Sequence, residues 1–183
     1  MKLAAAVLLL SFSVSLCAVA QTANQAPKAP PTLRSILLEQ LRTTHNAKSW
    51  FVDGNTAIAG LTAEQANWTD GKGNHSVGQL TYHLVFWNQR SLDKFTGKVQ
   101  GDYNGNNDET FNNFDSKKWA ATVQQFDQVM TEWEKAVETS DDKKLEAWYP
   151  TIARIGTHNA YHIGQIVYIR KLQGAWDAEK GVK

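Results

Sequence analysis

The scarcity of proline is the feature of this sequence that most limits its fold. Three of the four prolines lie between residues 27 and 31, so that Pro150 is the only one in the chain that follows. Proline removes a backbone hydrogen-bond donor and breaks helices in their interior, and a long stretch with one proline is therefore typical of a helical protein. The sequence predicts an all-α fold for the chain beyond residue 31.

The N-terminal residues have the pattern of a secretory signal peptide. Lys2 precedes an apolar run from Leu3 to Leu16, and Ala18-Val19-Ala20 fits the A-x-A cleavage pattern. The apolar run is short for a transmembrane span. We therefore expect residues 1–20 to be a signal peptide and the protein to be exported, periplasmic or secreted, with no stable membrane anchor after cleavage.

The rest of the chain divides by composition into three further parts. Residues 21–31 are rich in proline, alanine and glutamine and are expected to be a flexible linker. Residues 32–176 are expected to form the helical domain, and residues 177–183 a C-terminal tail. Cleavage of the signal peptide would remove Cys17, the one cysteine, and would leave no disulfide and no thiol nucleophile.

Charge excludes one broad class of partner. The chain has 19 lysines and arginines against 18 aspartates and glutamates. A nucleic-acid binder needs clustered excess positive charge to contact phosphates. We therefore expect no nucleic-acid partner, and a small molecule as substrate if the protein is an enzyme.

Hydrophobic periodicity and capping residues predict four long helices. The clearest pattern runs from Trp119 to Val137, where apolar residues recur at alternating spacings of four and three. Ser76 begins a Ser-x-x-Gln capping box, Gly97 is a typical helix stop, and Pro150 is a favoured first helical residue. In chain order, the expected helices span about residue 32 into the 50s, 76–97, 119–137 and 150–173. Joined by short to moderate loops, they predict an up-down-up-down four-helix bundle.

Three of the five histidines form a candidate metal site. His158 and His162 are four residues apart, which places both imidazoles on one face of a helix where they can bind one cation. His83 lies on the apolar side of the second predicted helix, between Leu80 and Trp87, and is the best third ligand. Three histidines would leave a coordination position open for substrate, as in catalytic sites. The alternative is that these are core or surface histidines with ordinary hydrogen bonds.

Further polar residues near these histidines are candidates for support of the metal ligands or for substrate binding. They are His45, Gln79, Arg90, Asn159 and Gln165. Arg90 is a candidate anion-binding group, against the more common role of a surface ion pair. The site does not match the zinc-protease motif, because Asn159 stands where that motif has a glutamate base.

The same histidine segments resemble those of a known family. The run Ser76-Val77-Gly78-Gln79-Leu80 leading to His83 and Trp87, with the later segment from His158 to Ile166, is similar to the DinB/YfiT-like superfamily of four-helix-bundle metalloproteins. The resemblance implies a metal triad that maps onto His83, His158 and His162, and a divalent ion of the zinc or nickel type. It also implies frequent dimers and, for some members, thiol-dependent transferase or isomerase activity, or hydrolase activity.

Two functional classes remain open at this stage. Export takes the chain away from the abundant thiols of the cytosol, which favours metal-dependent hydrolysis of an ester or amide over thiol transfer. The alternative is a non-catalytic metal-binding or stress-associated bundle. Gly156, Ala160 and Gly164 recur every four residues opposite the histidines, and the close helix approach that they allow predicts a homodimer or tight packing within the bundle.

Overall fold

The computed structural model describes residues 30–181, and every regular element in that range is helical. The predicted signal peptide and all of the predicted linker before Pro30 lie outside the described residues. Within residues 30–181, no helix is both long enough and apolar enough to span a membrane. The prediction of an all-α helical bundle is confirmed.

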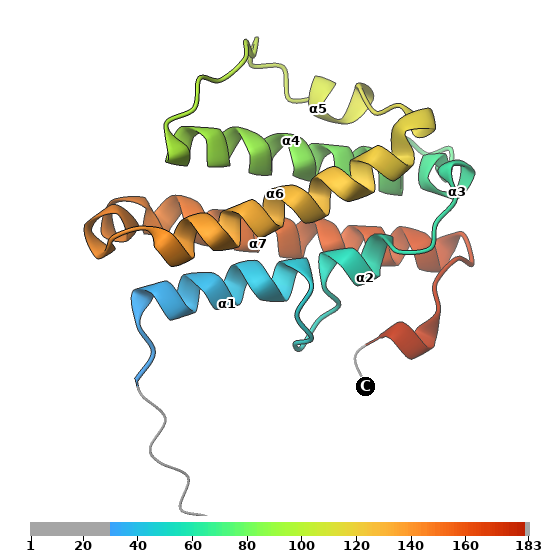
Figure 1. Ribbon diagram of the computed structural model, residues 1–183. Coiled ribbons are helices and arrows are strands. Elements are labelled where there is room, and N and C mark those ends of the chain that lie inside the picture. Colours follow the sequence, from blue (N-terminus) through green and yellow to red (C-terminus); the bar gives the residue numbers. More distant parts are fainter. Residues whose placement is uncertain (1–29, 182–183) are drawn as a thin grey trace, which may run out of the picture. The chain divides into compact units, whose positions relative to one another are not determined.

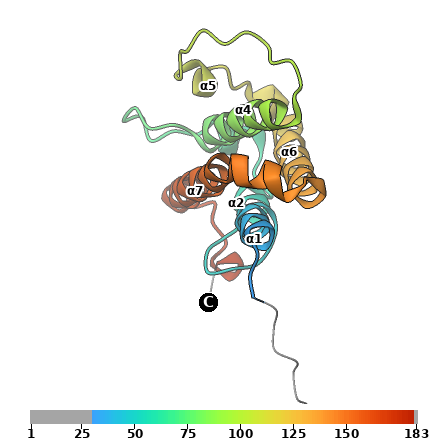
Figure 2. The same ribbon diagram turned by 90° about the vertical axis from the view of Figure 1, so that its left-hand side faces the viewer.

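Four long helices form the bundle (Figure 1). They are α1 (Leu33–His45), α4 (Val77–Thr96), α6 (Trp119–Thr139) and α7 (Asp142–Leu172). Viewed along the bundle, α1 and α4 lie on opposite corners, and each packs against both α6 and α7 (Figure 2). The buried side chains between them are mostly leucine, isoleucine, valine, phenylalanine and tryptophan, and Trp133 and Phe126 are the largest that are fully enclosed.

The directions of the helices differ from the predicted alternation. Helices α4 and α6 run parallel, because the start of α4 lies beside Phe114 and Trp119 while its end, at Phe95, contacts Trp133. Helix α7 runs antiparallel to α4, and α1 runs parallel to α7. The order is therefore up-down-down-up. The reason is the connection of residues 97–118, which is long enough to return along α4, a helix of about 30 Å, before α6 begins.

Short helices fill the connections. They are α2 (Gly54–Ile58), α3 (Ala63–Asn67) and α5 (Glu109–Asn112), with 3₁₀ turns at Ser116–Lys118 and Ala178–Lys180. Helix α5 is part of the returning connection and lies over α4 (Figure 1). The returning chain therefore covers one long helix of the bundle from outside.

Capping residues explain the helix ends that were predicted well. Ser76 and Gln79 form the predicted capping box of α4, and Gly97 ends that helix with a φ of 77°, which favours glycine. Two predicted boundaries are wrong. The first helix ends at His45 and α2 is separate, because Asp53 caps a new helix by accepting a hydrogen bond from the Thr56 amide.

The start of the last helix is the second wrong boundary. Helix α7 begins at Asp142, where Asp141 caps it, and it continues through Pro150. A proline inside a helix removes one backbone hydrogen bond. Packing of α7 against α1 and α4 outweighs that loss, so the proline is a poor guide to where the helix begins.

Candidate metal centre

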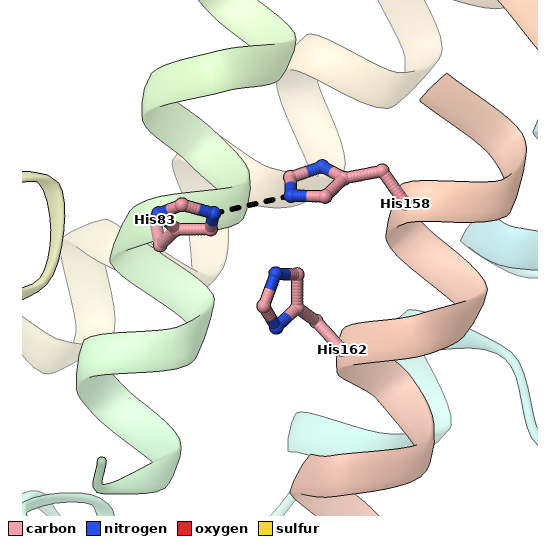
Figure 3. Close-up of side chains that lie close together, drawn as sticks. All are labelled: His83, His158 and His162. Carbon is pink, nitrogen blue, oxygen red and sulfur yellow. Dashed lines mark hydrogen bonds between the residues drawn. The ribbon is translucent and has the colours of Figure 1, made fainter. Parts of the chain in front are cut away.

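The structure brings three histidines together between α4 and α7. His83 projects from α4, and His158 and His162 project from successive turns of α7 toward it (Figure 3). One ligand nitrogen from each ring lies within 4.8 Å of the others. His83 is 3% exposed and His162 is 7% exposed, while His158 is half-buried. The triad has the composition and proximity of a three-histidine metal site.

Residues 97–118, the crossover connection between α4 and α6, fix the orientation of His83 through its Nδ1 atom. The Thr110 hydroxyl donates to the Asn107 carbonyl oxygen at 2.6 Å, so its oxygen is left as an acceptor for the His83 Nδ1–H, also at 2.6 Å. With the proton on Nδ1, the lone pair of His83 lies on Nε2. Hydrogen bonds of this kind fix the tautomer and ring orientation of metal-binding histidines.

His162 is oriented in the same way by its own helix. Its Nδ1 lies 2.6 Å from Gln165 Oε1, and the Gln165 amide in turn donates to the Tyr161 hydroxyl at 3.3 Å. This arrangement makes Gln165 an acceptor, so His162 carries its proton on Nδ1 and its Nε2 is free to bind an ion. Of the supporting residues considered from the sequence, Gln165 is the one that the structure places against a histidine of the triad.

The distances and protonation states of the triad fit a tetrahedral divalent ion. The Nε2 atoms of His83 and His158 are 3.1 Å apart. Two metal–nitrogen bonds of about 2.0–2.1 Å at a tetrahedral angle would place their nitrogens about 3.3 Å apart. The His83–His158 pair therefore lies close to the separation that a shared metal ion requires.

Burial keeps the three rings uncharged. Burial, followed by the repulsion of His162 and His158, lowers the pKa of His83 to about 3, and burial with repulsion from His162 lowers the pKa of His158 to about 4. Burial also lowers the pKa of His162, although its hydrogen bond to Gln165 opposes the shift. Neutral imidazole is the form that binds metal, so the site is ready for an ion at neutral pH.

Phe111 of α5 covers the α4 side of the site. Its ring stacks on His83 with centroids 3.9 Å apart, and on its other face it stacks on His75 with centroids 4.0 Å apart. His75, just before the Ser76 cap of α4, is partly buried. The crossover connection therefore supplies both a hydrogen-bond acceptor and an aromatic wall to the triad.

A cavity of about 600 Å³ opens onto the triad. All three histidines line it, together with Trp87 and Phe111, and Arg154 is the only charged side chain among the described residues of its wall. This volume lies within the range of about 300–1,000 Å³ that is usual for small-molecule sites. The three histidines thus line a space that is open to solvent.

Two of the residues that the sequence suggested near the triad, His45 and Arg90, have their partners elsewhere in the structure. His45 is 1% exposed, and its ring nitrogens lie 2.7 Å from Glu134 and 3.0 Å from Asp127, both on α6. It belongs to the α1–α6 side of the bundle, so its role is to join those helices. Arg90 donates to the Gly101 carbonyl oxygen and lies over the Tyr103 ring, so it holds the crossover connection instead of an anion in the cavity.

The other two candidates also have structural partners. Gln79 accepts from the Ser76 amide as part of the α4 capping box. Asn159 is fully buried and pairs with Asn88 of α4, whose amide donates to Asn159 Oδ1 at 2.8 Å. A residue next to His158 points about 100° away from it around the helix, which turns Asn159 into the core.

Sequence reasoning missed the contribution of the crossover connection and of Arg154 on α7. Thr110, Asn107 and Phe111 lie between the second and third predicted helices, and no periodic pattern there points toward His83. Arg154 precedes His158 by four residues on α7. Both residues lie inside the helix predicted for residues 150–173, so the spacing was sufficient to place Arg154 on the same face as His158.

Comparison with known proteins gives one match. The model of the DinB superfamily matches residues 55–166, a stretch that includes all three histidines of the triad. No curated protein and no solved structure matches the chain.

Proposed function

Because the chain belongs to the DinB superfamily and gathers three neutral imidazoles around an accessible cavity, we propose that it is an exported metalloenzyme. The ion would be divalent, zinc or nickel, held by His83, His158 and His162. The reaction would be a metal-dependent hydrolysis or group transfer on a small molecule.

The cavity is the observation that carries this proposal. A structural metal site is usually closed by four protein ligands, whereas a catalytic site keeps a position open. Here three histidines face a cavity of about 600 Å³ whose wall includes aromatic, hydroxyl and amide side chains. A metal site with a purely structural role does not require such an opening.

The residues of the cavity would bind and orient the substrate. A divalent ion at the triad would act as a Lewis acid and lower the pKa of a nucleophile bound to it. Trp87 and Phe111 offer apolar surface, and the Trp87 indole N–H donates to Asn107 Oδ1 at 3.2 Å, which fixes that wall. The described wall contains no carboxylate, so its side chains contribute binding and orientation.

Hydrolysis is the reaction that best suits the predicted location. An exported protein meets water in abundance and few low-molecular-weight thiols, and its single cysteine lies in the predicted signal peptide. We therefore place ester or amide hydrolysis ahead of thiol transfer.

Metal content and turnover test the proposal together. Protein purified without a tag should contain a stoichiometric divalent metal by elemental analysis, and His83→Ala and His158→Ala should each abolish its retention. His45→Gln is the matched control, because it removes a buried imidazole on the other side of the bundle and should leave the metal in place. Circular dichroism would show that each variant is folded.

A panel of esters, amides and thiol acceptors then separates an enzyme from a metal-binding protein. Turnover by metal-loaded protein that is lost with a chelator and in His158→Ala supports the enzyme. Stoichiometric metal without turnover of any substrate would point to the non-catalytic class. Absence of metal, with stability that a chelator does not change, would contradict both.

The homodimer is a separate proposal. Gly156 lies against Gln40 of α1, so its small size is used within the chain, whereas Gly164 is exposed and has open space beside it. Exposed Tyr161 and Tyr168 flank Gly164 on α7. Light scattering after size-exclusion chromatography would show a mass twice that of one chain if this face forms a dimer.

A further inference from the structure

Among residues 30–181, Arg154 has no partner for its charge at the wall of the cavity. The other four arginines of the described chain each donate to a carbonyl oxygen or pair with a carboxylate. Arg154 lines the cavity and has neither kind of contact within residues 30–181. An arginine that is free on a cavity wall is available to bind an anion from solution.

The rest of the described wall does nothing to neutralise this charge. It contains no aspartate or glutamate. With a divalent ion at the triad, the cavity would hold two positive groups, and its described wall would offer no negative charge to balance them. Such a cavity attracts anions.

Two hydroxyl groups on the same wall also have no hydrogen-bond partner within the described residues. Ser91 and Thr151 line the cavity, and neither side chain has a hydrogen bond within the described residues. Many other serine and threonine side chains in these helices, such as Thr81 and Thr96, donate to a carbonyl oxygen of the preceding turn. The free hydroxyls therefore add polar contacts beside Arg154, while Trp87 and Phe111 provide apolar surface.

Building on the proposed function, we propose that the cavity binds small carboxylates with an apolar or aromatic portion, and that Arg154 holds the carboxylate. The planar guanidinium donates two parallel hydrogen bonds that match the two oxygens of a carboxylate. Arg154 is the only cation among the described side chains of the wall, and it balances the single charge of a carboxylate, whereas a phosphate ester would need the metal ion to balance its second charge.

The spacing on α7 limits the form of the substrate. Arg154 lies four residues before His158, which is about 6 Å along the helix axis. A ligand held by Arg154 at one end would present an atom a few bonds away to the triad. The substrate class is therefore a short carboxylic acid whose susceptible bond lies near, but is separate from, the carboxylate.

Calorimetric binding of benzoate and its neutral analogue benzamide tests the role of Arg154 without any turnover. Zinc-loaded full-length protein should bind benzoate more tightly than benzamide. Arg154→Gln should weaken benzoate binding by roughly tenfold or more, as expected for loss of a charge-assisted hydrogen bond, and should leave benzamide unchanged. Arg154→Lys should retain part of the benzoate affinity, because lysine keeps the positive charge but cannot donate two parallel hydrogen bonds to the carboxylate.

Lys171→Gln is the matched control. It removes one positive charge from an exposed position on the same helix, outside the metal cavity, and should not change benzoate binding. An equal loss in Lys171→Gln would show that general charge attraction, and not Arg154, governs binding, and would overturn the proposal.

Several other results would overturn it. They are no benzoate binding at millimolar concentration, unchanged benzoate binding in Arg154→Gln, and an equal loss of benzoate and benzamide. Tighter Arg154-dependent binding of phenyl phosphate than of benzoate would overturn the choice of carboxylate.

Elemental analysis of the same samples keeps this test apart from that of the proposed function. If the wild-type protein holds no metal, the metalloenzyme fails, and the benzoate and benzamide titrations of the metal-free protein still decide whether Arg154 binds carboxylates. If the metal is present and Arg154→Gln changes nothing, the metal site stands and the assignment of the substrate class fails.

Discussion

The buried amide pair Asn88 and Asn159 links α4 to α7 close to the histidine triad, and its removal gives a quantitative test of the packing. Both side chains are 0% exposed. The Asn88 amide donates to Asn159 Oδ1 at 2.8 Å and to the Leu84 carbonyl oxygen at 2.7 Å, and the Asn159 amide lies 3.2 Å from Met130 sulfur. Each amide therefore depends on the other for one of its hydrogen bonds.

Replacing either asparagine by alanine should be costly, and replacing both should cost less than the sum. A single substitution leaves a polar atom of the other amide buried and unpaired, which costs about 1–3 kcal/mol, and the space vacated adds to that loss. We expect each single variant to lose about 2–4 kcal/mol. Removing the second asparagine also removes the unpaired group, so the coupling energy should be about 1–2 kcal/mol.

Urea denaturation of the metal-free protein measures this cycle. Four proteins are compared: wild type, Asn88→Ala, Asn159→Ala and the double variant. Asn159→Ala combined with Val137→Ala is the control, because Val137 lies about 10 Å along α6 from Met130 and its effect should add within about 0.5 kcal/mol. The reasoning would be refuted if the losses of stability in Asn88→Ala and Asn159→Ala simply added in the double variant. A loss below about 0.5 kcal/mol in either single variant would refute it as well. Because Asn159 points into the core, Asn159→Ala should also retain the metal if it folds.

Three further predictions follow from the site and its supports. Thr110→Val should remove the acceptor for His83 Nδ1 with little change of shape, and chelator competition should show metal affinity lowered about 10–100-fold. The pKa of His83 is lowered from 6.5 to about 3, so between these pH values the unfolded chain binds a proton that the folded metal-free chain does not. The contribution of His83 to the free energy of unfolding should therefore be complete above pH 6.5 and should be lost as the pH falls toward 3. Urea denaturation at each pH should show a steeper loss of stability for the wild type than for His83→Gln. Gly78→Ala should lower the free energy of unfolding by about 1–3 kcal/mol, because the added Cβ would collide with the Phe114 ring. Gly164→Ala has open space beside it and should raise the free energy of unfolding by up to about 1 kcal/mol. Thermal melts that rank the two variants in the opposite order would contradict this account.

Local signals in the sequence were enough to predict the elements that carry the histidines. The capping box at Ser76 and the glycine stop at Gly97 define α4, and the four-residue spacing of His158 and His162 defines one face of α7. These signals depend on neighbours within one or two turns, which is why they can be seen in the sequence.

The parts that could not be predicted depend on distant contacts. Helix α1 ends at His45, whose ring contacts two carboxylates of α6. Helix α7 extends to residues before Pro150, and it packs on α1 and α4. The direction of α6 depends on the path of the crossover connection, which has no periodic pattern. The same connection carries Thr110, so the residue that orients His83 was hidden for the same reason.

The crossover connection also bears on how the chain folds. In a bundle with alternating directions, helices that follow each other along the chain pack side by side, and such local contacts allow fast folding. Here α6 and α7 are joined by a short turn but lie across the bundle from each other, and the triad joins residues 75 positions apart. The chain must therefore close long loops before its main interfaces form, and we expect slower folding than for an alternating four-helix bundle of the same length.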